Sequence, residues 1–312
     1  MVILVTGATG FIGKNLVKAL SKSYRNIFCL VRNPQKAKLL DTYGVNLIYT
    51  DITQFDALAC RVPKKIDVIF HCAGFVSNRD RQMLHKVNVV GTENICKLAL
   101  RLGVKRMVYV SSVAVVSGYS RVPLVEDLPY KATNIYGYSK IEAEKVVLSY
   151  REKGLRSAIL RPCMVYGEDE PHLMRIMLCL LKYRLLPLVN SGKSKLHLVY
   201  VRNVVDALIF SLNNDGCLRG TFFIADKEVL TADRVLSIMA EAIGAKAPCR
   251  IPSVLTPLLS GIPYFGRQLR SFFKDRVYSM EKLISLGFVP SYPAESSLTI
   301  SCQAFFKTGR SL

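Results

Sequence analysis

The first apolar run of the chain, Val2–Thr6, leads directly into a turn with three glycines spaced three residues apart: Gly7, Gly10 and Gly13. An amphipathic segment, 13–21, opens on the last of them. Glycine lets the backbone turn tightly, so that N–H groups and the positive start of a helix approach an anion with no Cβ between them. A strand, a glycine turn and a helix in this order predict the first βα unit of a dinucleotide-binding fold.

The first half of the chain continues to alternate short apolar runs with amphipathic stretches, which is typical of βαβ units and a parallel sheet. We therefore expect an α/β fold with a doubly wound parallel sheet of the Rossmann type. The expected strands are 2–6, 27–31, 45–49, 68–72, 106–110 and 157–160, and the expected helices are 13–21, 35–40, 87–102 and 136–151.

The rhythm changes after Arg161-Pro162. Two apolar runs, 196–201 and 222–225, are expected to continue the sheet, whereas the amphipathic helices 172–184 and 232–243 are expected to belong to an added lobe. These patterns predict a dinucleotide-binding domain over 1–165 and a smaller C-terminal substrate-binding lobe over 166–312. Late elements of the first domain, at about 196–225, are interleaved with that lobe.

The end of the second strand predicts which dinucleotide is bound, because the residue there contacts the adenosine ribose. This chain has Arg32, whose charge suits the 2′-phosphate of NADP, and the nearest acidic residue downstream is Asp41 in the next helix. NADP is therefore favoured over NAD, although Arg32 stacking on the adenine of either cofactor is an alternative. Asp51, after the third strand, is expected to accept a hydrogen bond from the adenine amino group, to cap the following helix, or to do both.

A tyrosine and a lysine four residues apart lie on one face of a helix, where the ammonium favours the tyrosinate and lowers the pKa of the tyrosine. Such a pair suits proton transfer near neutral pH. The chain has two of them, Tyr136/Lys140 and Tyr278/Lys282, and about one is expected by chance. Context favours Tyr136, since it follows a strand that ends in Ser111-Ser112, at the carboxyl edge where open α/β sheets place their chemistry.

In combination these segments resemble the extended branch of the short-chain dehydrogenase/reductase superfamily, the NAD-dependent epimerase/dehydratase family. The resemblance covers almost the whole chain. It is carried by Thr6–Gly13 (TGATGFIG), Asp51, 71–74 (HCAG), 87–92 (VNVVGT), 109–112 (YVSS), 136–140 (YGYSK), Arg161-Pro162, 165–167 (VYG) and 197–207 (HLVYVRNVVDA).

The resemblance implies a role for each matching residue. Ser112 would bond the substrate oxygen, Tyr136 would move the proton, and Lys140 would hold the ribose hydroxyls and tune Tyr136. Asn88 would support the site, and His71 would back the cofactor loop. The implied cofactor contacts are Gly7, Thr9, Gly10, Phe11, Ile12, Gly13, Arg32, Asp51, Ile52, Ala73, Gly74, Ser111, Tyr136, Lys140 and Pro162, and no metal is implied.

One segment departs from the family pattern. Where the family has Val-Tyr-Gly soon after the catalytic serine, this chain has Val115-Val116-Ser117-Gly118, one residue longer. Counting back from Gly118 places Val113 at the serine position, whereas counting forward from the strand places Ser112 there. We favour Ser112, because a strand fixes the sheet edge and loops absorb insertions.

Two enzymatic activities fit these motifs. The first is net oxidation or reduction of a secondary alcohol or ketone, as in 3β-hydroxysteroid dehydrogenase-like and dihydroflavonol reductase-like enzymes; Arg32 favours it. The second is nucleotide-sugar epimerase or dehydratase chemistry, for which Lys193, Lys195, Arg202 and Arg270 could hold a diphosphate. A third, non-enzymatic alternative is an NADP-sensing module, but such a module is expected to have lost Ser112, Tyr136 or Lys140.

The charge and the cysteines constrain partners and location. The 43 Lys+Arg against 23 Asp+Glu give a net charge of +20, spread along the chain as a solvated surface or one that attracts phosphates and anionic lipid. No nucleic-acid motif accompanies it. Nine cysteines without a C-x-x-C pair indicate no zinc site and fit buried free thiols in a reducing compartment. We expect a cytoplasmic enzyme acting on a small-molecule substrate.

Two further expectations concern surfaces. Within the segment 251–276, the apolar piece 251–265 is too short and too interrupted by proline to span a bilayer, and the basic residues Arg267, Arg270, Lys274 and Arg276 follow it. The segment is expected to cap the core, to roof an apolar pocket or to contact the inner membrane face peripherally. The resemblance also implies a homodimer as one option, formed through the helices at 87–102 and 136–151.

Overall fold

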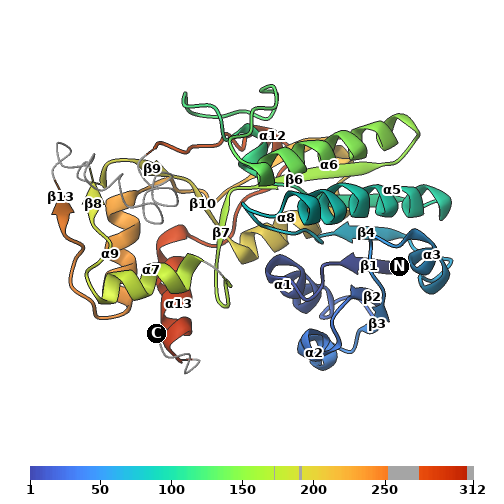
Figure 1. The fold of residues 1–312 in the computed structure, drawn as a ribbon, viewed down its shortest axis with the longest axis horizontal. Coiled ribbons are helices and arrows are strands. Elements are labelled where there is room, and N and C mark those ends of the chain that lie inside the picture. The colour runs from blue at the N-terminus through green and yellow to red at the C-terminus, as the bar shows by residue number, and fades with distance from the viewer. Residues whose placement is uncertain (172, 190–191, 252–273, 308–312) are drawn as a thin grey trace.

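The computed structural model describes residues 1–171, 173–189, 192–251 and 274–307. Its centre is a seven-stranded parallel sheet in the order β11-β6-β5-β4-β1-β2-β3 (Figure 1). The predicted α/β class with a doubly wound sheet is confirmed. The strands are β1 (Val2–Thr6), β2 (Asn26–Val31), β3 (Asn46–Tyr49), β4 (Val68–His71), β5 (Arg106–Val110), β6 (Ser157–Pro162) and β11 (Thr221–Ile224).

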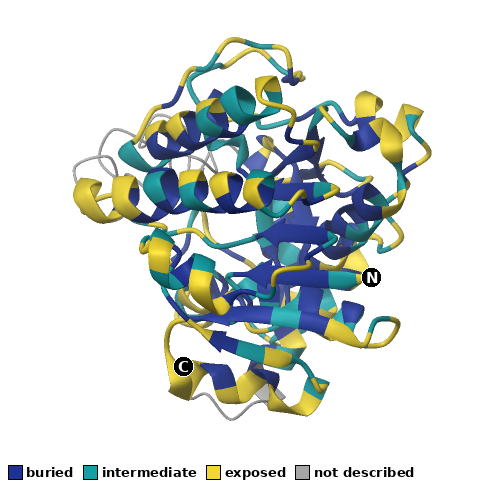
Figure 2. Cartoon of the chain, turned by 90° about the vertical axis from the view of Figure 1, so that its right-hand side faces the viewer, coloured by how far each residue is buried: buried dark blue, intermediate teal, exposed yellow. Residues whose placement is uncertain are grey.

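Helices cover both faces of this sheet because successive strand residues point to opposite sides. In β1, Ile3 and Val5 pack with the apolar sides of α1 (Phe11–Leu20) and α8 (Val201–Asn213), whereas Leu4 packs with the layer of α5 (Gly91–Arg101) and α6 (Ile135–Glu152). Figure 2 shows the result, with buried strands between helices that are exposed only on their outer sides. Two short helices, α2 (Pro34–Ala37) and α3 (Phe55–Arg61), flank the β2–β3 side of the sheet.

The C-terminal lobe lies beyond the carboxyl end of the sheet, at the left of Figure 1. Its core is formed by α7 (Leu173–Lys182), α9 (Ala232–Ala242) and α13 (Ala294–Lys307). A short helix, α12 (Glu281–Ser285), precedes the last of these. Three two-stranded sheets complete it: β7 (Met164–Tyr166) with β10 (Leu198–Tyr200), β9 (Lys195–Leu196) with β12 (Leu230–Thr231), and β8 (Leu188–Val189) with β13 (Arg250–Ile251).

Several sequence predictions need correction. The run 196–201 does not continue the main sheet, because Leu196 pairs with β12, residues 198–200 pair with β7 and Val201 begins α8; in contrast, 222–224 joins the sheet as part of β11. The short helices α3 and α4 (Arg81–Leu84) were not predicted. The helix expected at 87–102 begins as a π-helical turn over His85–Val90. Tyr278 of the second Tyr/Lys pair does not lie on a helix: it is buried against Phe223 and precedes α12.

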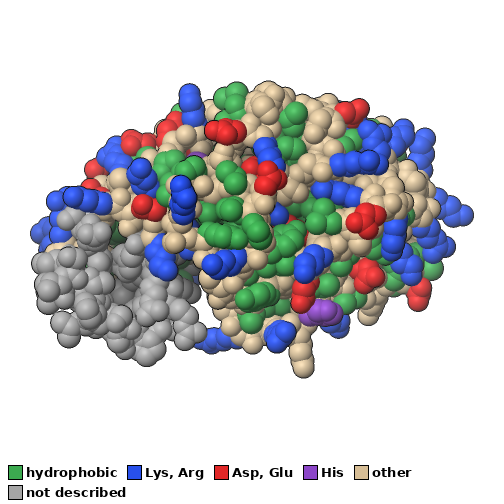
Figure 3. Space-filling view, turned by 90° about the horizontal axis from the view of Figure 1, so that it is seen from above, with side chains coloured by type: hydrophobic (Ala, Val, Ile, Leu, Met, Phe, Trp, Pro, Cys, Tyr) green, Lys and Arg blue, Asp and Glu red, His purple; other side chains and the backbone are tan. Residues whose placement is uncertain are grey.

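Other expectations concern the surface. All nine cysteines are free, but Cys60 and Cys249 are exposed rather than buried. On the face that Figure 3 shows, basic side chains outnumber acidic ones and are spread over the surface, with apolar side chains between them. Among the described residues, no helix combines the length and the apolar character needed to cross a bilayer. The predicted membrane contact at 251–276 falls almost wholly on residues 252–273, outside the described part of the chain.

A buried carboxylate joins the lobe to the sheet. Asp226, directly after β11, accepts hydrogen bonds from Tyr166 Oη at 2.8 Å, Tyr200 N at 2.8 Å and Asn203 Nδ2 at 2.7 Å, and its carbonyl oxygen lies 2.7 Å from His197 Nε2. Burial raises the pKa of Asp226 to about 6, against the opposing effect of these donors. His197 is a buried partner of this junction.

The raised pKa of Asp226 predicts that the free energy of unfolding depends on pH. The pKa of Asp226 is higher in the folded than in the unfolded chain, so protonated Asp226 adds to the free energy of unfolding at low pH. This contribution, up to about 3 kcal/mol, is lost as the pH rises to about 6. Asp226→Asn removes this titration. We therefore expect the stability of the variant, relative to the wild type, to improve between about pH 4 and about pH 7. Urea denaturation across that range measures it, and a pH-independent difference would contradict the assignment.

Candidate active site

The glycine turn after β1 is closely packed against the end of β4. Gly7 has a φ of 67°, and a Cβ built on it would lie 2.6 Å from the backbone nitrogen of Ala73. A Cβ on Gly13 would overlap the carbonyl oxygen of Gly7. The turn is closed by a hydrogen bond from Gly10 N to Gly7 O at 2.9 Å, and α1 begins at Phe11. Only glycine can be accommodated at positions 7 and 13. Because no Cβ intervenes, the N-terminus of α1 lies directly at the sheet edge.

A cleft with a volume of about 180 Å³ opens at this turn. It includes eight of the predicted cofactor contacts and four residues that sequence reasoning missed. The predicted ones are Gly7, Thr9, Gly10, Arg32, Asp51, Ile52, Ala73 and Gly74, and the missed ones are Leu30, Thr50, Cys72 and Val87. Leu30, Thr50 and Cys72 lie within a residue of the ends of β2, β3 and β4, and that position was the available signal.

The cleft residues fit a dinucleotide. The side-chain oxygen of Thr50 is buried and has no hydrogen-bond partner among the described residues, so it retains bonding capacity in the cleft wall. Arg32 is two-thirds exposed, and its guanidinium lies 3.8 Å from the Asp51 carboxylate. Asp51 also accepts a hydrogen bond from Thr53 N at 2.9 Å, in a turn that precedes α3. The glycine turn would hold the pyrophosphate, and Arg32 and Asp51 would hold the adenosine.

The predicted catalytic residues come together where α6 meets the turn after β5. Asn134 caps α6 by accepting a hydrogen bond from Gly137 N at 2.7 Å. A Cβ on Gly137 would lie 2.7 Å from the carbonyl oxygen of Ala114, so glycine lets the first turn of α6 approach this loop closely. Tyr136 is thereby placed beside Ser112, whose hydroxyl accepts a hydrogen bond from Ala114 N at 3.2 Å and acts to lower the pKa of the tyrosine. Ser112 is the residue counted forward from the strand, and its catalytic role stays a prediction.

Lys140 is 4% exposed and lies one helical turn after Tyr136. Its ammonium donates to the carbonyl oxygen of Val110 at 2.9 Å and to Tyr109 Oη at 3.2 Å. Burial lowers the pKa of Lys140 to about 8, and the carboxylate of Glu144 opposes this shift. A Cβ on Gly74 would lie 3.6 Å from Lys140 Nζ, so the ammonium is next to the cofactor cleft.

The expected effect of Lys140 on Tyr136 is not seen. Burial raises the pKa of Tyr136, and the group that opposes this is Ser112 rather than Lys140. The physical reason is the direction of the lysine side chain, since its ammonium hydrogen-bonds groups of β5.

Two polar side chains, Asn88 and His71, hold the loop after β4 in place next to the site. Asn88 receives a hydrogen bond from Phe75 N at 2.7 Å and donates to Ser139 Oγ at 2.9 Å, which ties the loop after β4 to α6. His71 is fully buried between Thr6 Oγ1 at 2.7 Å and Thr92 Oγ1 at 3.0 Å, and Thr6 Oγ1 accepts from Ala73 N. Burial and the charge of Lys140 lower the pKa of His71 to about 3, so this histidine is a neutral support of the loop.

Four of the predicted cofactor contacts, Ser111, Pro162, Phe11 and Ile12, do not line the cleft. The hydroxyl of Ser111 hydrogen-bonds the buried carboxylate of Glu144, and neither residue lines the cleft. Pro162 is buried in β6, in register with Ile224 of β11. Phe11 and Ile12 lie at the start of α1, where the ring of Phe11 packs on the lobe. Their cofactor contacts stay predictions.

Comparison with known proteins agrees with this geometry. The model of the NAD dependent epimerase/dehydratase family matches residues 3–224. The chain is 31% identical over 264 residues to a 3 beta-hydroxysteroid dehydrogenase/Delta 5-->4-isomerase of Mycobacterium tuberculosis, covering 79% of this chain and 70% of that protein. It is 30% identical over 248 residues to a UDP-glucose 4-epimerase of Vibrio cholerae, covering 75% and 73%.

The fold also matches a solved structure across its whole length. UDP-glucuronic acid 4-epimerase from Bacillus cereus in complex with NAD superposes with a TM-score of 0.81 at 19% identity, covering 99% of both chains. The glycine turn, the seven-stranded sheet and the family match together confirm the family predicted from the motifs. The chain belongs to the NAD dependent epimerase/dehydratase family and is an NAD(P)-dependent enzyme of the extended short-chain dehydrogenase/reductase type.

Proposed function

We propose that this enzyme transfers a hydride to or from the carbon of a secondary alcohol or ketone, in the manner of 3β-hydroxysteroid dehydrogenase-like or dihydroflavonol reductase-like enzymes. The observation that carries the proposal is the grouping of Ser112, Tyr136 and buried Lys140 at the carboxyl edge of the sheet, next to the cleft. The similarity to the mycobacterial hydroxysteroid dehydrogenase supports this substrate class.

Each of the three residues has a role that its surroundings allow. Ser112 hydrogen-bonds the substrate oxygen and stabilises charge on it, and Tyr136 gives or takes the proton at that oxygen. Lys140 holds the cofactor ribose hydroxyls with its ammonium, which burial and Val110 O keep beside Gly74. The bound nicotinamide supplies or accepts the hydride.

Nucleotide-sugar epimerase or dehydratase chemistry is the second candidate, supported by the similarity to the Vibrio cholerae epimerase. Of its proposed diphosphate ligands, Arg202 is engaged with Glu168 at 2.8 Å and Lys195 is exposed, whereas Arg270 lies outside the described residues. Arg202 would have to leave Glu168 to bind a diphosphate. A catalytically inactive NADP-binding module is a lesser candidate, and the intact Ser112, Tyr136 and Lys140 count against it.

The cofactor carried by the purified protein discriminates these candidates. Net reduction predicts exchangeable NADPH that is consumed stoichiometrically with a ketone, whereas an epimerase cycle predicts retained NAD and no net change in absorbance at the nicotinamide band. Mass spectrometry of the released cofactor, followed by assays with 3β-hydroxysteroids, aliphatic and aromatic ketones and UDP-glucose, tests this. Tightly held NAD with turnover of UDP-glucose alone would overturn the first proposal, and no turnover of any substrate class would favour the binding module.

Arg32 is the residue on which the proposed NADP preference depends. Its exposed guanidinium can pair with a 2′-phosphate, so Arg32→Ala is expected to weaken NADPH binding about tenfold to a hundredfold and NADH binding little. Fluorescence titration of both cofactors measures the effect. Arg25→Ala is the matched control, since Arg25 is exposed just before the opposite end of β2. A wild-type preference for NADH would contradict the assignment.

A further inference from the structure

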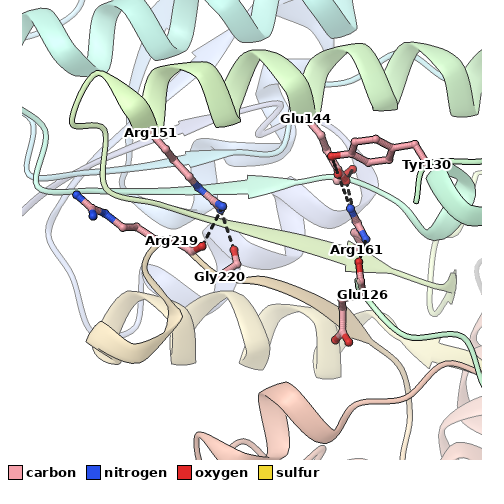
Figure 4. A network of polar contacts seen from close by, with 8 residues as sticks. Glu126, Tyr130, Glu144, Arg151, Arg161, Arg219 and Gly220 are labelled. Carbon is pink, nitrogen blue, oxygen red and sulfur yellow. Dashed lines mark hydrogen bonds and ion pairs between the residues drawn. The ribbon is translucent and has the colours of Figure 1, made fainter. Parts of the chain in front are cut away.

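Behind Lys140 lies a buried carboxylate that the proposed mechanism does not use. Glu144 is 0% exposed and accepts hydrogen bonds from Arg161 Nε at 2.9 Å, Arg161 Nη2 at 2.7 Å, Tyr130 Oη at 2.8 Å and the hydroxyl of Ser111. Figure 4 shows Glu144 reaching down from α6, Arg161 reaching up from β6 and Tyr130 joining them from the side. We call these four residues the Glu144 network. Each of the two carboxylate oxygens accepts two hydrogen bonds within the network.

The network contacts two parts of the candidate site. Glu144 lies one helical turn after Lys140, on the same side of α6. Ser111, which it binds, immediately precedes Ser112. A single carboxylate therefore fixes the strand end that carries Ser112 against the helix that carries Tyr136 and Lys140.

The network also contributes a charge. Lys140 shares a face of α6 with Tyr136 and Glu144, and its ammonium is faced by Tyr109 on β5 and by His71 and Cys72 at the end of β4. Among the groups that act on its pKa, the carboxylate of Glu144 is the largest influence that keeps it protonated. Arg161, the counter-charge of Glu144, lies on the β6 side of the carboxylate and also donates to Glu126 O at 3.0 Å.

We propose that Glu144 is a positioning residue, which holds Lys140 in its charged form and in place beside the cofactor cleft. The proposal rests on the function proposed above, in which the Lys140 ammonium binds the cofactor. If Lys140 loses its proton, that ammonium contact is weakened, so cofactor affinity is expected to fall as the pH rises through the pKa of Lys140, about 8. Removing the charge of Glu144 would move this fall to lower pH.

The test is the pH dependence of NADPH binding, followed by fluorescence between about pH 7 and about pH 9.5, where the charge of this probe is constant. In the wild type the Kd is expected to rise above about pH 8. In Glu144→Gln the rise is expected about one pH unit lower. Because this variant leaves Arg161 buried without its partner, the double variant Glu144→Gln/Arg161→Met is measured beside it. The double variant removes both charges, so the rise in its Kd is expected at a pH between those of the wild type and Glu144→Gln.

Two further variants make the outcome decisive. Arg151→Met is the control: Arg151 lies two turns further along α6 and donates to Ser157 Oγ, Arg219 O and Gly220 O (Figure 4), so its loss is expected to lower stability without moving the pH profile. Lys140→Met is expected to abolish the pH-dependent rise. If Lys140→Met removes the rise but both Glu144 variants follow the wild type, or Arg151→Met shifts the profile equally, the role of Glu144 is overturned. If Lys140→Met keeps the wild-type rise, the proposed function of Lys140 fails instead.

Discussion

Tyr136→Phe is expected to lower turnover by about 10²-fold to 10⁴-fold while leaving the Kd for NADPH nearly unchanged. The phenol oxygen is the group beside Ser112 that can exchange a proton with the substrate oxygen, and phenylalanine keeps the ring that packs there. Steady-state kinetics with any substrate that the cofactor assays identify, together with fluorescence titration of NADPH, measures both quantities.

The matched control for this variant is Tyr138→Phe. Tyr138 lies on the same helix but is 56% exposed, directed away from Lys140. Its substitution is expected to leave turnover unchanged. Full activity of Tyr136→Phe would refute the Ser112–Tyr136–Lys140 mechanism, and equal losses in the two variants would assign the effect to the helix rather than to the proton.

Arg161→Met is expected to lower the free energy of unfolding by about 3–5 kcal/mol. Both members of the pair are nearly inaccessible, with side-chain exposures of 5% for Arg161 and 0% for Glu144, so the variant leaves a buried carboxylate without its cation. Chemical denaturation at neutral pH measures the loss.

The double variant Glu144→Gln/Arg161→Met is expected to recover most of that stability, since no unpaired charge remains. The surface pair of Arg234 and Glu295 provides the control: its members are 46% and 47% exposed at 2.6 Å, and Arg234→Met is expected to cost less than about 1 kcal/mol. Similar losses at Arg161 and Arg234 would mean that water reaches the Glu144 network.

The sequence predicts most of the elements of the sheet because local patterns determine them. The apolar runs that became β1 and β5 are bounded by turn residues, and the glycine turn identifies the helix that follows. Tyr136, Lys140 and Ser112 could be identified because helix spacing and strand ends are visible in one dimension. The run 196–201 was misassigned for a physical reason: residues 198–200 pair with β7, which is also only three residues long, and pairing between distant segments leaves no local pattern.

The Glu144 network could not be predicted in the same way. Its members are separated by up to 50 positions, from Ser111 to Arg161, and a glutamate in the middle of a helix is usually solvated. The hydrogen-bond partners of the Lys140 ammonium could not be predicted either. The spacing of Tyr136 and Lys140 places both side chains on one face of the helix, but it does not determine which neighbour each of them bonds.

The position of β11 has a consequence for how the chain acquires its structure. This strand pairs with β6 but is separated from it by about sixty residues, which build much of the lobe. During synthesis the sheet therefore cannot close until that stretch has left the ribosome, and β6 meanwhile presents an unpaired edge. A fragment ending shortly after residue 165 would keep the cofactor turn and the three candidate catalytic residues, yet it would carry a permanently open, apolar strand edge and is expected to aggregate.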